Sequence, residues 1–132
     1  MNWNLLGFVM AGGALGAAGR FVIGDYALRH FNQGLPWGTL IVNLVGSFAA
    51  GYLYIWLGSR GADAHHWRAF LMVGVLGALT TYSALMLECL VYFRAEKHGQ
   101  VLIYLLISLV AGLFLVWLGA RSAEMITGIN TN

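Results

Sequence analysis

The feature that most constrains this 132-residue chain is its division into four long stretches without a charged residue. The stretches cover residues 1–19, 30–59, 69–87 and 98–120. A helix needs about 20 mostly apolar residues to cross a hydrocarbon core roughly 30 Å thick, and each stretch has room for one such helix. We therefore predict an all-α membrane protein, a single domain whose four spans cover about 4–25, 37–58, 68–93 and 101–120. No stretch alternates in the way that a membrane β-strand would.

Composition excludes several other classes of protein. Charged residues make up only 9% of the chain and hydrophobic residues 60%, whereas a soluble domain carries about a quarter charged residues. The net charge of +2 is too small to predict nucleic-acid binding. The spans contain neither a nucleophile–base pair nor a metal-ligand pattern, so we do not expect an enzyme. The N-terminus lacks the basic region of a signal peptide, and we expect it to begin a mature spanning helix.

The distribution of basic residues does not favour one orientation in the membrane. Four spans place Arg60, Arg68 and Arg121 on one side, and Arg29, Arg94 and Lys97 on the other, with Arg20 added if its side chain reaches outward. Orientation normally follows the side with more Lys and Arg. One side has three basic residues and the other has three or four, so neither orientation is preferred. This balance is compatible with insertion in both directions and assembly as an antiparallel pair.

Small residues recur at the four-residue spacing that allows membrane helices to approach closely. The pairs are Gly12/Gly16, Gly46/Ala50, Ser47/Gly51 and Ser108/Gly112. Part of this pattern predicts packing within one subunit. A dimer interface is the other interpretation, and the sequence leaves both open.

Polar residues inside two spans are the more informative signal, because each costs free energy in lipid unless it finds a partner. Asn43 lies inside the second span and offers two N–H donors. The third span contains Gly74, Gly77 and then a run of four hydroxyl-bearing residues over 80–83. A broken helix would expose carbonyls that side chains, a cavity or an ion must satisfy. Carbonyls converging without a carboxylate would suit a hard monovalent cation such as Na⁺.

Three segments together resemble the motifs of the Fluc/CrcB fluoride channel family. They are residues 12–21 (GGALGAAGRF), 38–48 (GTLIVNLVGSF) and 74–83 (GVLGALTTYS). They occur in the order and on the spans expected for that family, and the resemblance covers essentially the whole chain. Each motif alone is modestly specific, whereas the combination is strongly so.

The resemblance implies an antiparallel, dual-topology homodimer with two fluoride pores and a break in the third helix. It also implies a structural Na⁺, not itself transported, held by the main-chain carbonyls of Gly77 and Thr80 from both subunits. The implied fluoride pathway consists of Asn43, Tyr82, Ser83, Leu85, Tyr104, Ser108 and Thr39. Arg20 matches the arginine that follows the family's first glycine-rich motif, and Glu88 matches a carboxylate late in the third span. A vestibule or a structural role is expected for each.

One position departs from the family pattern. The family presents the edges of two phenylalanine rings, three residues apart, to fluoride, since the ring edge carries positive charge. Here Tyr82 keeps a ring and adds a hydroxyl, whereas Leu85 has no ring. A channel using one ring edge per pore, a slowed pore, and a pore-impaired subunit that needs an aromatic-bearing partner chain are the three interpretations.

The function expected from these observations is passive export of cytoplasmic fluoride across the cell inner membrane. The chain contains no ATP-binding loop, and an inside-negative potential of 100 mV supplies about 2.3 kcal/mol per charge. The alternative is a small four-span, dual-topology exporter of organic cations. That exporter needs a carboxylate in a central cavity, and Glu88 is the candidate. Besides fluoride and a second copy of the chain, only membrane lipid is an expected partner.

Overall fold

The structure, a computed structural model, describes residues 2–31 and 34–128, and its regular elements there are all helical. Two long α-helices come first, and a short 3-10 turn follows them. A third span then begins as α-helix, continues as π-helix and resumes as α-helix in two further pieces, before a final long α-helix. The elements are α1 (Trp3–His30), α2 (Trp37–Gly58), η1 (Gly61–Ala64), α3 (His65–Trp67), η2 (Arg68–Leu76), α4 (Gly77–Leu79), α5 (Tyr82–Arg94) and α6 (His98–Thr127).

Four segments are long and apolar enough to cross a membrane, which confirms the predicted number of spanning helices. They are α1, α2, the combined segment His65–Arg94, and α6. The second has the expected bounds, whereas the other three extend beyond the expected spans. The Asn2 side chain accepts hydrogen bonds from the Asn4 and Leu5 amides and so begins α1. Gly128, in the left-handed conformation, ends α6.

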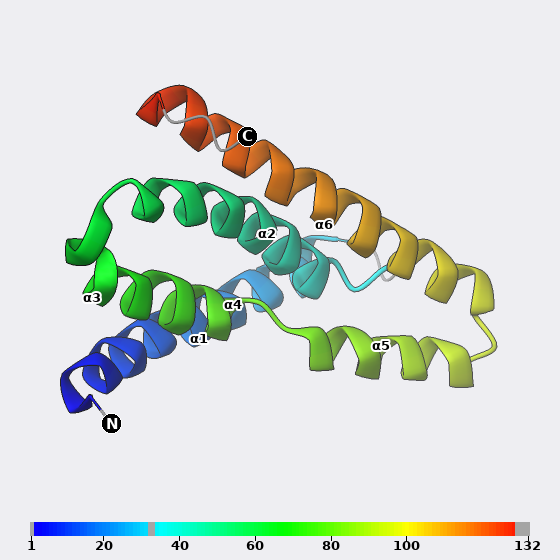
Figure 1. Cartoon of the computed structure of the whole chain (residues 1–132). Helices are drawn as coiled ribbons and strands as arrows, with labels where there is room; N and C mark the ends of the chain where they lie inside the picture. The colour runs from blue at the N-terminus through cyan, green and yellow to red at the C-terminus, as the bar shows by residue number, and fades with distance from the viewer. Residues whose placement is uncertain (1, 32–33, 129–132) are drawn as a thin grey trace.

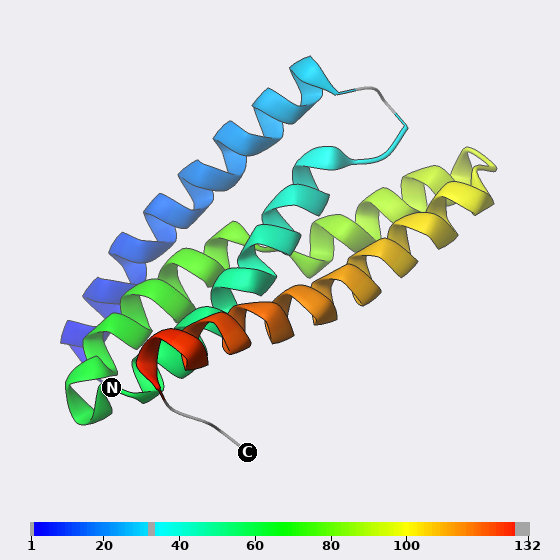
Figure 2. The same ribbon diagram turned by 90° about the horizontal axis from the view of Figure 1, so that it is seen from above.

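Glycines allow close contacts between two pairs of helical segments. A Cβ on Gly12 or Gly16 of α1 would overlap carbonyl oxygens of the third span, those of Phe70 and Val75. A Cβ on Gly119 of α6 would likewise overlap the carbonyl of Phe48 on α2. The ribbon shows α6 running alongside α2 in both views (Figures 1 and 2). Small residues therefore pack helices within one chain here, as part of the pattern predicts.

The third span is not a continuous helix. Thr80 has φ −84° and ψ 155°, and Thr81 has φ −156° and ψ 121°, so both residues are extended. The Thr81 hydroxyl accepts a hydrogen bond from the Ala84 amide and thereby begins α5. Figure 1 shows the chain leaving α4 as an extended link before α5 starts. These two residues lie near the middle of the 30-residue segment that is long enough to cross a bilayer.

Helix α5 packs mainly against α6 and less against α2, and Figure 2 shows it beside the first half of α6. One face carries Leu85 and Cys89, which form a buried cluster with Leu40 and Tyr104. Its other face is apolar and exposed in the single chain, at Leu87, Leu90 and Val91 among others. Lipid or another protein surface would cover that face in a membrane.

Candidate ion-pathway site

The side chain of Asn43 holds the extended segment of the third span in place. Its Oδ1 accepts a hydrogen bond of 2.8 Å from the Thr81 amide, and its Nδ2 donates one of 3.0 Å to the Thr81 carbonyl. One side-chain amide thus pairs with both backbone groups of a residue outside the helix, which satisfies them away from water. The second N–H of Nδ2 is not used in this pairing.

This pairing removes a helical hydrogen bond from Gly77. In a regular α-helix the Thr81 amide would donate to the Gly77 carbonyl four residues earlier, but it donates to Asn43 instead. The Thr80 carbonyl points away from the helical direction because Thr80 is extended. Meanwhile the Thr80 hydroxyl and amide both donate to the Leu76 carbonyl, at 2.8 and 3.0 Å.

A second polar group joins α2, α5 and α6 around one carboxylate. The Thr39 hydroxyl donates to Glu88 Oε1 at 2.6 Å, and the Tyr104 hydroxyl donates to Glu88 Oε2 at 2.7 Å. Tyr104 is fully buried, whereas Thr39 and Glu88 are half-buried. Each oxygen of Glu88 therefore receives one hydroxyl group, and this cluster ties the three helices together.

The other candidate residues lie in contrasting environments. Tyr82 is 75% exposed and Ser83 is exposed, whereas Leu85 is 7% exposed and packs in the cluster with Tyr104. The Ser108 hydroxyl oxygen is buried and makes no hydrogen bond within the part of the chain that the structure describes. A buried polar atom without a partner is unfavourable, and Ser108 is therefore a place where a polar ligand would be stabilised.

Six of the candidate residues line two cavities of about 310 Å³ each. One cavity lies beside the interruption and is lined by Asn43, Thr80, Tyr82 and Leu85 with their neighbours. The other is lined by Thr39 and Glu88 and opens near the end of α1. Arg20 is half-buried on α1 and lines neither cavity. The other candidates that line neither are Gly77, Ser83, Tyr104 and Ser108.

Sequence reasoning missed Thr81, which is the partner of Asn43 and the residue that caps α5. A threonine directly before a helical run is the signal that could have identified the cap. Its pairing with Asn43 has no local signal, because the two residues are 38 positions apart.

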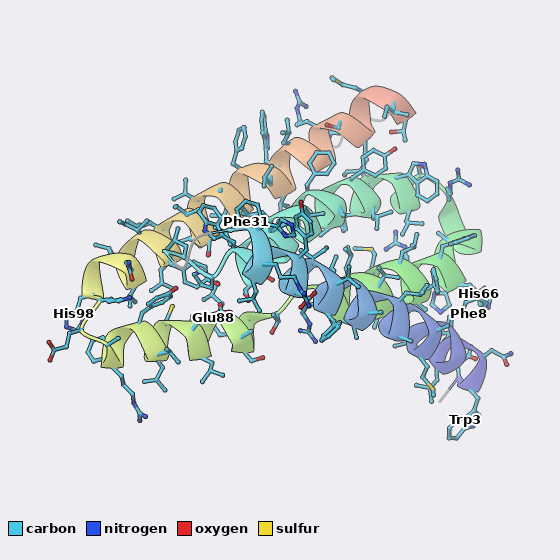
Figure 3. The ribbon with its side chains drawn as sticks, turned by 180° about the vertical axis from the view of Figure 1, so that it is seen from behind. Trp3, Phe8, Phe31, His66, Glu88 and His98 are labelled. Atoms are coloured by element: carbon cyan, nitrogen blue, oxygen red, sulfur yellow. The ribbon has the colours of Figure 1, made fainter. Side chains whose placement is uncertain are left out.

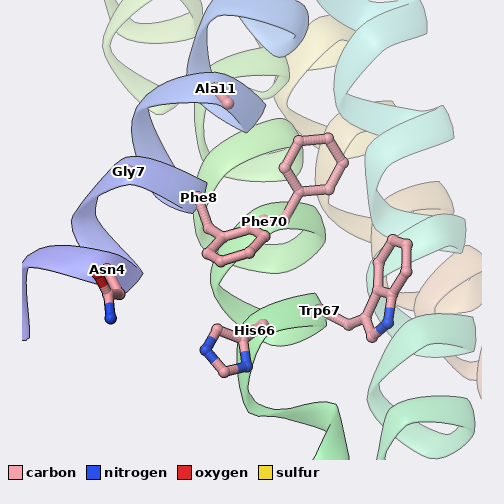
Figure 4. Close-up of a pocket in the computed structure, with 7 residues that line it drawn as sticks. All are labelled: Asn4, Gly7, Phe8, Ala11, His66, Trp67 and Phe70. Carbon is pink, nitrogen blue, oxygen red and sulfur yellow. The ribbon is translucent and has the colours of Figure 1, made fainter.

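A larger cavity of about 720 Å³ lies at the other end of α1 (Figure 4). Phe8, Trp67 and Phe70 supply its aromatic lining, and His66 packs against Phe8 with 5.0 Å between the ring centroids. None of the residues that the sequence proposes for an ion pathway lines this cavity.

Comparison with known proteins identifies the class. The model of the CrcB-like protein family, described as Camphor Resistance (CrcB), matches residues 7–120. The chain belongs to this family and, with its four membrane-spanning helices, is a multi-pass membrane protein. The family resemblance expected from the three motifs is confirmed.

Individual relatives cover nearly the whole chain. A protein of Xylella fastidiosa (strain 9a5c), named fluoride-specific ion channel FluC, is 54% identical over 119 residues, which is 90% of this chain and 83% of the relative. A protein of Xanthomonas euvesicatoria pv. vesicatoria (strain 85-10) with the same name is 51% identical over 92% of both chains. One from Caulobacter sp. (strain K31), also so named, is 39% identical over 92% of this chain and 95% of its own length.

Proposed function

We propose that this protein is a fluoride-selective channel that exports fluoride passively from the cytoplasm across the cell inner membrane. The observation that carries the proposal is the match, over about nine-tenths of the chain, to relatives named fluoride-specific ion channels. Those names describe channels, which agrees with the expectation that the chain is not an enzyme. A membrane potential of 100 mV, negative inside, would supply about 2.3 kcal/mol for each fluoride ion that leaves.

Fluoride binds water strongly, so a selective pore must replace that water with N–H and O–H donors. The cavity beside the interruption has such groups in reach: the second N–H of Asn43, and the ring edge and hydroxyl of Tyr82. The exposed hydroxyl of Ser83 and the unpartnered, buried hydroxyl of Ser108 extend this set. We assign these residues to the fluoride pathway.

Thr39 and Tyr104 would act differently from the other pathway residues. Their hydroxyl hydrogens are directed at the Glu88 carboxylate. Each hydroxyl can donate to a passing fluoride only after leaving Glu88, because a hydroxyl has one hydrogen. Glu88 would thereby hold the two donors in place and compete with the anion for them. Arg20 lies ten residues before the end of α1, and its positive charge would draw anions towards the pathway.

The functional unit in this proposal is an antiparallel homodimer with two pores. Two features of the chain support it: nearly equal numbers of basic residues at the two ends of the spans, and an exposed apolar face on α5. The carbonyls of Gly77 and Thr80 are released from ordinary helical bonding, which fits the expected Na⁺ because hard cations prefer oxygen ligands. Such an ion would neutralise the carbonyl dipoles at the interruption and hold the two subunits together.

The test uses purified protein in liposomes loaded with either fluoride or chloride, with efflux followed by ion-selective electrodes. Fluoride release far above chloride release is the expected result. Proton-coupled uptake of a quaternary ammonium with no fluoride release would replace the proposal with the cation exporter. If neither fluoride release nor ammonium uptake is detected, the chain is a subunit that needs a partner chain. The missing aromatic ring at Leu85 would explain that result.

A further inference from the structure

The glycine at position 46 of α2 faces a side chain rather than the backbone of a neighbouring helix. A Cβ on Gly51 or Gly119 would meet a main-chain carbonyl oxygen of the other helix. At Gly46 the atoms within 4 Å of such a Cβ are instead Cγ2 and Cβ of Thr80, and Cγ2 would overlap it. Gly46 is buried and lines the cavity beside the interruption together with Thr80. The missing side chain at position 46 thus makes room for one methyl group of the third span.

The side-chain conformation of Thr80 is fixed from two directions. Its hydroxyl donates a hydrogen bond of 2.8 Å to the Leu76 carbonyl, and its methyl carbon lies against Gly46. Because both groups are attached to the same Cβ, a rotation that moved the methyl away would also break the hydroxyl bond. A larger residue at position 46 would therefore displace the Thr80 backbone, including the carbonyl that points away from the helical direction.

The same side of α2 also holds the next residue of the interruption. Asn43 and Gly46 are three residues apart and so are neighbours on the helix surface. Asn43 pairs with the amide and the carbonyl of Thr81, whereas Gly46 accommodates the side chain of Thr80. Figure 3 shows the extended link from behind, next to the half of the third span that carries Glu88. One face of α2 therefore fixes two consecutive extended residues, one by hydrogen bonds and one by shape.

We propose that Gly46 is a positioning residue of the ion pathway, which accommodates the Thr80 methyl and thereby sets the direction of the backbone at the interruption. Gly46 and Thr80 line the cavity that also contains Asn43 and Tyr82, so a displaced Thr80 would change the walls of that cavity. The role in ion flow rests on the proposed function, whereas the role in holding the interruption does not.

The first test separates the methyl group of Thr80 from its hydroxyl, in mixed micelles titrated with SDS. Gly46→Ala should raise the ratio of unfolded to folded protein at a fixed SDS fraction by at least about fivefold, because the added Cβ overlaps Cγ2. Thr80→Ser removes Cγ2 and keeps the hydroxyl, and the remaining Thr80 Cβ lies 3.6 Å from the added Cβ, an ordinary contact distance. Gly46→Ala should therefore cost little in a Thr80→Ser background. Thr80→Val is the matched control: it keeps a methyl in that place and loses the hydroxyl, so Gly46→Ala should stay costly beside it.

The second test is fluoride efflux from liposomes, normalised to the amount of folded protein. Gly46→Ala should lose efflux, and Gly46→Ala combined with Thr80→Ser should recover the efflux of Thr80→Ser alone. Recovery through the loss of a methyl group cannot come from general misfolding, so it decides the matter even if Gly46→Ala alone does not fold.

Three results would overturn the proposal. They are an undiminished cost of Gly46→Ala beside Thr80→Ser, equal relief by Thr80→Val, and unchanged efflux in Gly46→Ala. A failure of the proposed function is distinguishable, because the unmodified protein would then release no fluoride. The SDS titration would still decide whether Gly46 holds the interruption through Thr80.

Discussion

Replacing Asn43 with leucine should destabilise the protein more than removing any other single hydroxyl or amide in the spans. Leucine branches at the same atom as asparagine but can neither donate nor accept a hydrogen bond. The Thr81 amide and carbonyl, now paired with Asn43 at 2.8 and 3.0 Å, would both lose their partner. The extended segment would then have two unsatisfied backbone groups near the middle of the third span.

The size of the effect follows from those two groups. Each backbone group left unpaired away from water costs about 1–3 kcal/mol, so Asn43→Leu should lower the free energy of unfolding by about 2–6 kcal/mol. Asn43→Asp should be intermediate, because its carboxylate still accepts from the Thr81 amide but places an oxygen opposite the Thr81 carbonyl. Ser108→Ala is the matched control, since the Ser108 hydroxyl oxygen is buried without a partner in the described residues.

The assay is unfolding in mixed micelles titrated with SDS, in fluoride-free buffer, followed by the fluorescence of the five tryptophans. The expected order of stability is Ser108→Ala and the unmodified protein together, then Asn43→Asp, then Asn43→Leu. Hydrogen exchange at the Thr81 amide should accelerate in Asn43→Leu. A loss below about 1 kcal/mol in Asn43→Leu, or one no larger than in Ser108→Ala, would refute the role given to this pairing.

Three further predictions concern other contacts. Gly119→Ala should cost about 1–3 kcal/mol of stability by forcing a Cβ against the Phe48 carbonyl, whereas Gly13→Ala, where nothing lies within 4 Å, should be neutral or stabilising in the same SDS titration. Thr39→Val, which removes the hydroxyl donated to Glu88, should cost about 1.5–3 kcal/mol; a variant as stable as the unmodified protein would show that the bond contributes nothing. Leu85→Phe should raise fluoride efflux from liposomes by restoring a ring edge, and unchanged or reduced efflux would remove the missing ring as a limit on throughput.

The spanning helices could be predicted because lipid leaves a chain few choices. Without water, backbone groups must pair within the segment, so a long uncharged stretch becomes a helix. The ends of those helices could not be placed as well. The third span begins at His65 and α6 continues to Thr127, because local caps and packing, rather than hydropathy, decide where a helix stops.

Individual residues of the candidate site could be predicted from the sequence, but the contacts between them could not. Asn43 was recognisable because an amide inside a span needs a partner, yet nothing near it in the sequence indicates Thr81. Glu88 is 49 positions from Thr39 and 16 from Tyr104, so their convergence depends on how α2, α5 and α6 pack. The burial of Leu85 against Tyr104 likewise follows from that packing and not from its place beside the hydroxyl-rich run.

The interruption at Thr80 and Thr81 places two helix termini inside the membrane, end to end. Aligned peptide dipoles give the closing end of the first half-helix a partial negative charge and the opening end of α5 a partial positive charge. Two poles of opposite sign therefore lie only two residues apart, near the middle of the third span. An ion at this depth would therefore meet main-chain partial charges of both signs, whatever side chains lie beside it.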